Sequence, residues 1–240
     1  MNFTFNSIGT AESCFKERFG TPRQPGLVPL ARARIILEPQ FAGALDGLES
    51  FSHLWVIFVF HQNTNKGVKN KIHPPRLQGE KIGVLASRSP HRPNPIGMSV
   101  VKILEIKGNE LLVGGVDFID GTPILDLKPY VPRFDSISDA NQGWLETKPL
   151  TLIPVEFEEL ALSKISSYAE KSKYHSSMDL KELIQQTLAL DPRPNFYKGS
   201  LENPDPYMSQ YGFCLEDFNV VFQMRAGVAF VTDLIPDFKK

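Results

Sequence analysis

The first 150 residues alternate short runs of β-branched and aromatic residues with turns rich in proline and glycine. The clearest run is His53–His61, which is too short for a core helix and apolar enough for a buried strand. Further strands are expected at residues 3–8, 31–37, 82–86, 98–106, 110–116 and 124–127. Strands at short spacing, with no long helix between them, favour an antiparallel sheet or barrel over a parallel sheet. We therefore expect a mainly β fold, with an antiparallel β-barrel domain over residues 1–150.

The pattern changes after residue 150, where helical spacing begins. Residues 160–171 and 178–190 have the spacing of amphipathic helices, and Ser176 with Asp179 forms a capping box for the second. Residues 218–224 and 228–234 are expected to form a hairpin across a short turn. Residues 151–240 are thus predicted to be a smaller α+β domain.

The charge of the chain is balanced overall and uneven locally. There are 26 Lys and Arg against 27 Asp and Glu, which gives a net charge of −1. Residues 61–92 nevertheless hold seven basic side chains against the single acid Glu80. A concentrated basic stretch indicates an anionic partner such as RNA or a phosphorylated ligand, although a solvated loop with scattered lysines has the same composition.

Several classes of protein are excluded by what the sequence lacks. The longest uninterrupted apolar run, residues 54–60, is far below the roughly 20 residues of a membrane helix, and no secretory signal pattern opens the chain. Cys14 and Cys214 give neither a disulfide framework nor a zinc site, which favours a reducing cytoplasm. His53 and His61 lack a carboxylate or thiolate at matching spacing, so no metal is expected. No G-x-G-x-x-G, P-loop or G-x-S-x-G motif is present, which argues against a Rossmann fold.

Polar side chains gather in four segments that also hold turn residues. The segments are residues 22–27, 61–62, 88–98 and 117–130. Each alone has a structural interpretation, such as a turn at Asp120-Gly121 or a hydrogen-bonded histidine at the end of a strand. Together they indicate a binding site, because prolines beside a polar residue reduce the entropy lost when it meets a ligand.

Two of these segments carry strings specific enough to indicate a family. RPNPIG at residues 92–97 and DGTPILDLKPY at residues 120–130, with PRQPGL at residues 22–27, resemble the TsaA-like (YaeB) family of tRNA N6-methyltransferases. The resemblance extends over nearly the whole chain. It implies an enzyme that uses S-adenosylmethionine (SAM) on an antiparallel barrel and methylates N6 of threonylcarbamoyladenosine at tRNA position 37. One departure is Cys14, where the family usually has proline after the preceding serine.

The resemblance also implies the cofactor site and the assembly. A homodimer is expected, and covering the edge of an incomplete barrel would favour one. Among the cofactor residues, Arg88 suits the methionine carboxylate, whereas Leu27 and Met98 suit the face of the adenine. The expected SAM-binding residues are Pro25, Gly26, Leu27, His61, Gln62, Arg88, Met98, Asp117, Asp120, Gly121, Thr122, Pro123 and Ile124.

The tRNA side of the site is expected in the same segments and in the basic stretch. Either Asp120 or Asp126 is the candidate that orients N6 or accepts its proton, and the sequence does not choose between them. The expected substrate-binding residues are Lys69, Lys71, Arg92, Asn94, Lys128 and Tyr130. Two alternatives stay open: a non-catalytic barrel that binds a nucleotide or RNA, and a SAM-dependent methyltransferase that acts on a small molecule.

Overall fold

The computed structural model describes residues 1–63, 69–77, 79–194, 198 and 210–236. Lys66, one of the basic residues noted above, lies outside the described residues. The chain folds into two compact units, and each draws on separate parts of the sequence. The first unit comprises residues 1–12, 33–114 and 121–150; the second comprises residues 13–32, 115–120 and 151–240.

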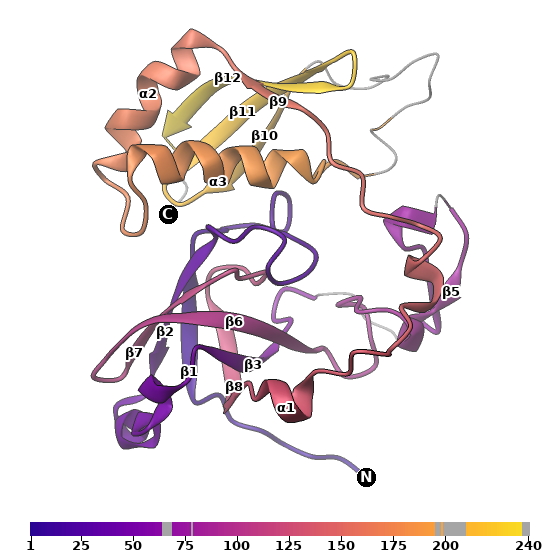
Figure 1. The fold of residues 1–240 in the computed structure, drawn as a ribbon, viewed down its shortest axis with the longest axis vertical. Coiled ribbons are helices and arrows are strands. Elements are labelled where there is room, and N and C mark those ends of the chain that lie inside the picture. The colour runs from indigo at the N-terminus through magenta and orange to yellow at the C-terminus, as the bar shows by residue number, and fades with distance from the viewer. Residues whose placement is uncertain (64–68, 78, 195–197, 199–209, 237–240) are drawn as a thin grey trace. The chain divides into compact units, whose positions relative to one another are not determined.

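A closed barrel of six strands is the main element of the N-terminal half (Figure 1). Its strands are β1 (Gly9–Ser13), β2 (Arg32–Leu37), β3 (His53–Val59), β6 (Ile96–Lys107), β7 (Glu110–Gly114) and β8 (Thr122–Pro129), and they close in the order β1-β2-β7-β6-β3-β8. The pairs of β3 with β6, β3 with β8, β6 with β7 and β1 with β8 are antiparallel. The mainly β prediction is confirmed. Because the barrel is closed, the expectation of an incomplete barrel with an open edge is wrong.

Alternating side chains fill the interior of the barrel. Along β3, Leu54, Val56 and Phe58 are buried, and the residues between them are only half-buried. This alternation is the period of two that a strand with one buried face requires. Gly97 on β6 faces the ring of Phe58, where a Cβ atom would lie 2.3 Å from two ring carbons. The glycine of the RPNPIG string therefore leaves room for a core aromatic ring.

Two predicted strands are wrong in position or extent. Residues 3–8 form no strand, and β1 begins at Gly9, directly after the end of the strand that was expected. A Cβ atom on Gly9 would lie 2.3 Å from the Ile36 carbonyl oxygen, so this glycine permits close contact with β2 instead of ending a strand. In the segment 82–86, only β5 (Ile82–Gly83) pairs, with β4 (Lys71–Ile72), and residues 84–86 form a 3-10 helix.

Short helical turns complete the first unit. They are α1 (Pro132–Asp135) and the 3-10 helices Pro39–Leu45, Leu48–Ser50, Pro75–Leu77, Val84–Ala86 and Gly143–Leu145. Among the described residues, no helix combines the length and the apolar character needed to cross a bilayer.

The C-terminal part of the second unit is a four-stranded sheet with two helices. Its elements are β9 (Val155–Phe157), α2 (Glu159–Ala169), α3 (Ser177–Ala189), β10 (Tyr211–Leu215), β11 (Phe218–Arg225) and β12 (Val228–Pro236). The sheet order is β10-β11-β12-β9, and only the β12–β9 pair is parallel. The predicted helices and the terminal hairpin are confirmed, and the Ser176 hydroxyl accepts the Asp179 amide at 3.3 Å, as the capping box requires. Strands β9 and β10 escaped the sequence-based assignment.

Candidate functional site

Two loops of the second unit meet at a pair of glycines. The Gly26 amide donates to the Gly115 carbonyl at 2.9 Å, and the Gly115 amide donates to the Ala31 carbonyl at 2.8 Å. Both glycines have positive φ, +75° and +74°, which a residue with a side chain rarely adopts. A Cβ atom on Gly26 would meet nothing within 4 Å. The main chain at Gly26 is therefore held by hydrogen bonds, and the space where a side chain would be is open. This arrangement suits a backbone segment that hydrogen-bonds to a ligand.

Leu27, the next residue, faces α3. It lines a groove of about 510 Å³, a volume in the usual range of ligand pockets. Leu152, Met178, Gln186 and Leu190 are among the other lining residues. Leu27, at the end of the loop 22–27, thus lines the same groove as residues of α3, a helix of the same unit.

Asp120 uses both of its carboxylate oxygens within the protein. Oδ1 accepts the Ser13 amide at 2.8 Å, and Oδ2 pairs with the Lys16 ammonium at 3.1 Å. The Asp120 amide also donates to the Phe15 carbonyl at 2.8 Å. These contacts connect the segment 115–120 to residues 13–16, so the arrangement favours an orienting role for Asp120 over that of a free proton acceptor. Asp117, three residues earlier, is half-buried.

The structure brings His61 next to the turn at Gly121. A Cβ atom on Gly121, which has φ of +72°, would lie 3.9 Å from His61 Nε2. His61 is exposed directly after β3, and Gln62 beside it is half-buried. Two expected cofactor positions that are distant in sequence are therefore neighbours in the first unit.

The proline-rich loop after residue 88 is fixed to the end of β3 by a side chain that the sequence analysis missed. Asn63 donates from Nδ2 to the Pro90 carbonyl at 2.7 Å, and its Oδ1 lies 3.0 Å from His91 Nδ1. The Phe60 amide also donates to the Pro95 carbonyl at 2.8 Å. The available signal was the position of Asn63 directly after the polar pair at residues 61–62.

The two arginines of this loop differ in their surroundings. The Arg92 guanidinium is half-buried and donates to the Ser87 carbonyl at 3.2 Å, so part of its donor capacity braces the loop. The Arg88 side chain is exposed, as is Asn94. Met98 on β6 is 55% exposed, on the face opposite to the buried Gly97 and Ser99.

The end of β8 forms a polar and aromatic strip with β3. Asp126 Oδ2 pairs with the Lys128 ammonium at 2.9 Å, and its Oδ1 accepts the Leu127 amide at 2.9 Å. The Tyr130 ring lies 5.8 Å from that of Trp55, which is the strand partner of Lys128. Asp126, Lys128 and Tyr130 therefore occupy a common surface at this end of β8, which combines two charged groups with an aromatic ring.

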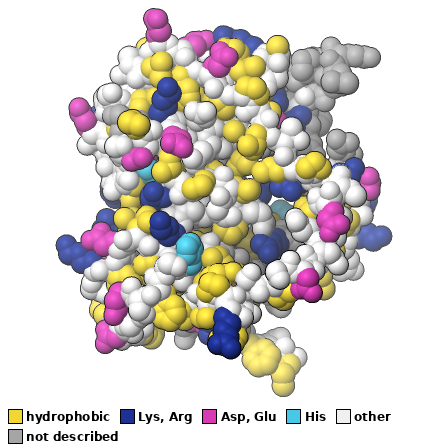
Figure 2. All heavy atoms as spheres, viewed as in Figure 1, with side chains coloured by type: hydrophobic (Ala, Val, Ile, Leu, Met, Phe, Trp, Pro, Cys, Tyr) yellow, Lys and Arg dark blue, Asp and Glu magenta, His cyan; other side chains and the backbone are white. Residues whose placement is uncertain are grey.

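The remaining expected residues divide into core and surface positions. The Thr122 and Ile124 side chains are 2% and 0% exposed and belong to the barrel core, whereas Pro123 is half-buried. Lys69 and Lys71 are exposed. Figure 2 shows basic and acidic side chains interspersed on the face in view. In the part of the chain that the structure describes, no three His, Cys, Asp or Glu side chains are grouped as a metal site would require.

Cys14, where the resemblance implied a proline, is fully buried. Burial raises the pKa of its thiol to about 12, so the thiol stays protonated and unreactive. Its amide donates to the Arg32 carbonyl at 3.1 Å. A proline here would have no N–H for that bond.

These features define a class of protein. A closed antiparallel barrel carries rigid glycine and proline loops, and the sequence has no glycine-rich phosphate loop, which separates the chain from doubly wound nucleotide-binding folds. The family model for the tRNA-methyltransferase O (TrmO) N-terminal domain matches residues 10–136, and the model for the TrmO C-terminal domain matches residues 151–237. The chain belongs to the TrmO family.

Individual relatives agree along most of the chain. A putative S-adenosylmethionine-dependent methyltransferase of Pseudomonas aeruginosa is 41% identical over 223 residues, which cover 92% of each chain. The tRNA (adenine(37)-N6)-methyltransferase of Escherichia coli is 38% identical and covers 91% of this chain and 92% of its own. A crystal structure of TrmO from P. aeruginosa superimposes with a TM-score of 0.78 at 37% identity, with 98% of both chains covered.

Proposed function

We propose that this chain transfers a methyl group from SAM to N6 of adenosine 37 in tRNA. The observation that carries the proposal is the match to both TrmO domains, together with an Escherichia coli relative of that named activity that covers 91% of the chain. The closed barrel with ordered loops agrees with the fold of the TrmO crystal structure.

The proposed substrate is an adenosine 37 that already carries a threonylcarbamoyl group on N6. That nitrogen keeps one hydrogen, and its lone pair is delocalised into the ureido carbonyl and the purine. Cationic side chains suit the threonyl carboxylate, and Arg92 and Lys128 are the proposed partners. Tyr130, whose ring is tilted against Trp55, suits stacking on a base turned out of the anticodon loop. Asn94, Lys69 and Lys71 are exposed and are proposed to contact the RNA.

The residues present fit SAM at the loop 25–27. The fixed and open main chain at Gly26 suits an adenine edge, and Leu27 supplies an apolar contact. When bound, SAM supplies an electrophilic methyl group on a sulfonium. The exposed Arg88 is proposed to pair with its carboxylate, and Asp117 to bind its ribose or ammonium group. His61, Gln62, Met98 and the segment 120–124 complete the proposed set, with Thr122 and Ile124 contributing main chain because their side chains are buried.

Methylation exchanges the N6–H bond for an N6–CH₃ bond and releases one proton. Asp120 is proposed to orient the site, because its contacts with the Ser13 amide and the less exposed Lys16 join two segments that are distant in the sequence. Asp126 is the proposed acceptor of the N–H, since its ion-pair partner Lys128 is exposed and can move to a substrate carboxylate.

Titration of SAM into two arginine variants tests this site. Arg88→Ala is expected to lose about 1.5–3 kcal/mol of SAM affinity, the value of a hydrogen bond to a charged group. Arg92→Ala is expected to bind SAM normally and to lose tRNA affinity. Calorimetry, tRNA gel shifts and melting temperatures measure these effects. If both variants bind SAM and tRNA like the wild type, the proposed site is wrong. If the wild type binds RNA but no SAM, the result would instead favour a non-catalytic barrel.

A homodimer is proposed, with the outer face of β6 in the interface. Ile96 and Met98 point to the same side of this strand and are 39% and 55% exposed, which is unusual for apolar side chains in the middle of a sheet. Ile96→Glu, at the position on this face that is outside the proposed SAM set, is expected to convert a dimer to a monomer in light scattering at micromolar concentration. A wild type that is monomeric and fully active would refute the dimer.

The proposed compartment is the cytoplasm. Cys14 and Cys214, the two cysteines of the chain, form no disulfide, which fits a reducing environment.

A further inference from the structure

We propose that His175 is a positioning residue for the cofactor loop, by which we mean residues 13–32. It hydrogen-bonds the end of this loop to the C-terminal module, which is the part of the second unit that follows residue 150, and so sets SAM affinity without contact with SAM. The inference rests on the proposed function in one respect, the assignment of residues 25–27 to the cofactor. All residues involved belong to the second unit.

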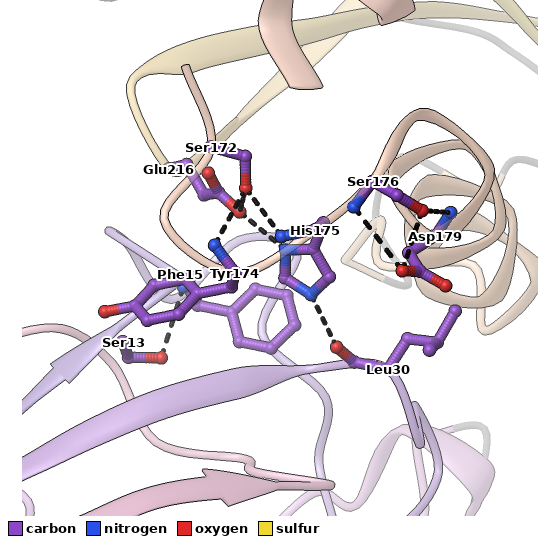
Figure 3. A network of polar contacts seen from close by, with 9 residues as sticks. All are labelled: Ser13, Phe15, Leu30, Ser172, Tyr174, His175, Ser176, Asp179 and Glu216. Carbon is purple, nitrogen blue, oxygen red and sulfur yellow. Dashed lines mark hydrogen bonds and ion pairs between the residues drawn. The ribbon is translucent and has the colours of Figure 1, made fainter. Parts of the chain in front are cut away.

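The imidazole of His175 lies between a carboxylate and the loop (Figure 3). Nδ1 is 2.7 Å from Glu216 Oε1, and Nε2 is 2.7 Å from the Leu30 carbonyl oxygen. The His175 side chain is 1% exposed and that of Glu216 is 9% exposed. The Ser172 hydroxyl donates to Glu216 Oε1 at 2.9 Å and accepts the His175 amide at 2.9 Å. Ring and carboxylate are thus held in one orientation.

The partners of the ring define what it does. Both are hydrogen-bond acceptors, so a ring that carries a proton on each nitrogen satisfies both, and the Glu216 carboxylate balances its charge. A buried polar group that loses its partner is costly, so the contact with Leu30 resists opening. Leu30 is three residues from Leu27, and its amide also faces Gln186 Oε1 on α3 at 3.4 Å.

The beginning of the same loop is fastened by the turn between β10 and β11. The Glu216 amide donates to the Cys14 carbonyl at 2.7 Å, and the Cys214 amide donates to Glu17 Oε1 at 2.9 Å. Phe15 forms a β-bridge with Leu215. Glu216 therefore contacts the loop start through its backbone and the loop end through His175.

This double attachment gives the C-terminal module a function in cofactor binding. Residues 22–29 carry three prolines, which restrict the loop, but their position depends on the two anchored ends. A loop already held in its binding conformation loses less entropy when a ligand binds. Release of Leu30 would therefore weaken SAM binding, although every proposed SAM contact is retained.

The test compares His175→Ala with Ile165→Ala in the full chain. Ile165 is buried in α2, and its aliphatic side chain makes no hydrogen bond to the loop, so it controls for destabilisation of the module. His175→Ala is expected to raise the Kd and KM for SAM on the order of tenfold, the effect of one lost hydrogen bond, with a smaller change in kcat. It is also expected to speed amide hydrogen exchange in the peptide 20–31, and added imidazole should reverse both effects by filling the vacated site. Ile165→Ala should lower the melting temperature and leave the Kd for SAM unchanged.

Two outcomes would overturn the proposal. One is a His175→Ala variant with wild-type SAM affinity and wild-type exchange in the peptide 20–31; the other is an equal loss of SAM affinity in Ile165→Ala. If the wild type itself binds no SAM, the proposed function fails. The exchange and imidazole measurements need no SAM, so unchanged exchange in that case would separately refute the attachment of the loop.

Discussion

Asp120 shows why a carboxylate in a polar loop is difficult to assign from its sequence position. In the DGTP string it has the residue type of a proton acceptor, a ribose ligand or a turn former. The structure shows two engaged oxygens, one with the Ser13 amide and one with the Lys16 ammonium. Neither partner is close in sequence, so only the folded chain distinguishes these roles.

Replacement of Asp120 separates an orienting role from a chemical one. Asp120→Ala removes both contacts and is expected to lower the free energy of unfolding by about 1–3 kcal/mol. Asp120→Asn retains one acceptor oxygen and should lose less. Urea unfolding of the two variants, beside methyl-transfer rates at saturating substrates, makes the comparison. Wild-type stability combined with a rate more than about a hundredfold lower would instead identify a proton acceptor.

At the scale of elements, the sequence predicted those whose signals are local. The helix α3 was recognised from its spacing and from a capping box formed by neighbours in the chain. The strand β3 was recognised from an uninterrupted apolar run. The strands β1 and β10, which were misplaced and missed, each contain a glycine that lies close to another strand. A glycine inside a strand gives no strand signal in the sequence. Gly9 faces the Ile36 carbonyl, and Gly212 faces the Asn219 side chain at 2.7 Å from the position of its missing Cβ.

The candidate site was predictable only in part, for the same reason. Turn residues and polar strings located its loops, because their signals lie within a few residues. The contacts that hold the loops come from elsewhere, as with Asn63 bonded to Pro90 and His175 bonded to Leu30. The two partners of each hydrogen bond are far apart in the sequence, so no local pattern predicts their contact.

The turn after α3 is expected to lose stability in acid through Asp191. Its carboxylate is 2.9 Å from Arg193 Nε and 3.1 Å from Lys198 Nζ. Burial raises the pKa of Asp191, but the hydrogen bonds and charges of Arg193 and Lys198 outweigh it and hold the pKa below its usual range. A depressed pKa contributes stability above the unfolded value of about 3.9, and this contribution is lost as the pH falls through the folded value.

Asp191→Asn tests that contribution. The difference in unfolding free energy between wild type and variant should be largest near neutral pH and should shrink below about pH 4. Urea unfolding at several pH values measures it. A difference that is constant across this range would mean that the carboxylate charge contributes nothing.

At the scale of the whole molecule, the compact units do not follow the order of the sequence. The loops 13–32 and 115–120 are inserted between barrel strands, yet they belong to the same unit as residues 151–240. The match to a TrmO C-terminal domain covers residues 151–237, and the loop 13–32, proposed to bind the cofactor, belongs to the same compact unit.

Transfer of a labelled methyl group tests the proposed function most directly. The full chain is incubated with SAM that carries a trideuteriomethyl group and with tRNA from a strain that lacks the modification. Nucleosides are then analysed by mass spectrometry. The account predicts the labelled methyl on N6 of threonylcarbamoyladenosine at position 37, and much less of it with Arg88→Ala at limiting SAM. Absence of label from tRNA, with SAM bound and the protein folded, would contradict it.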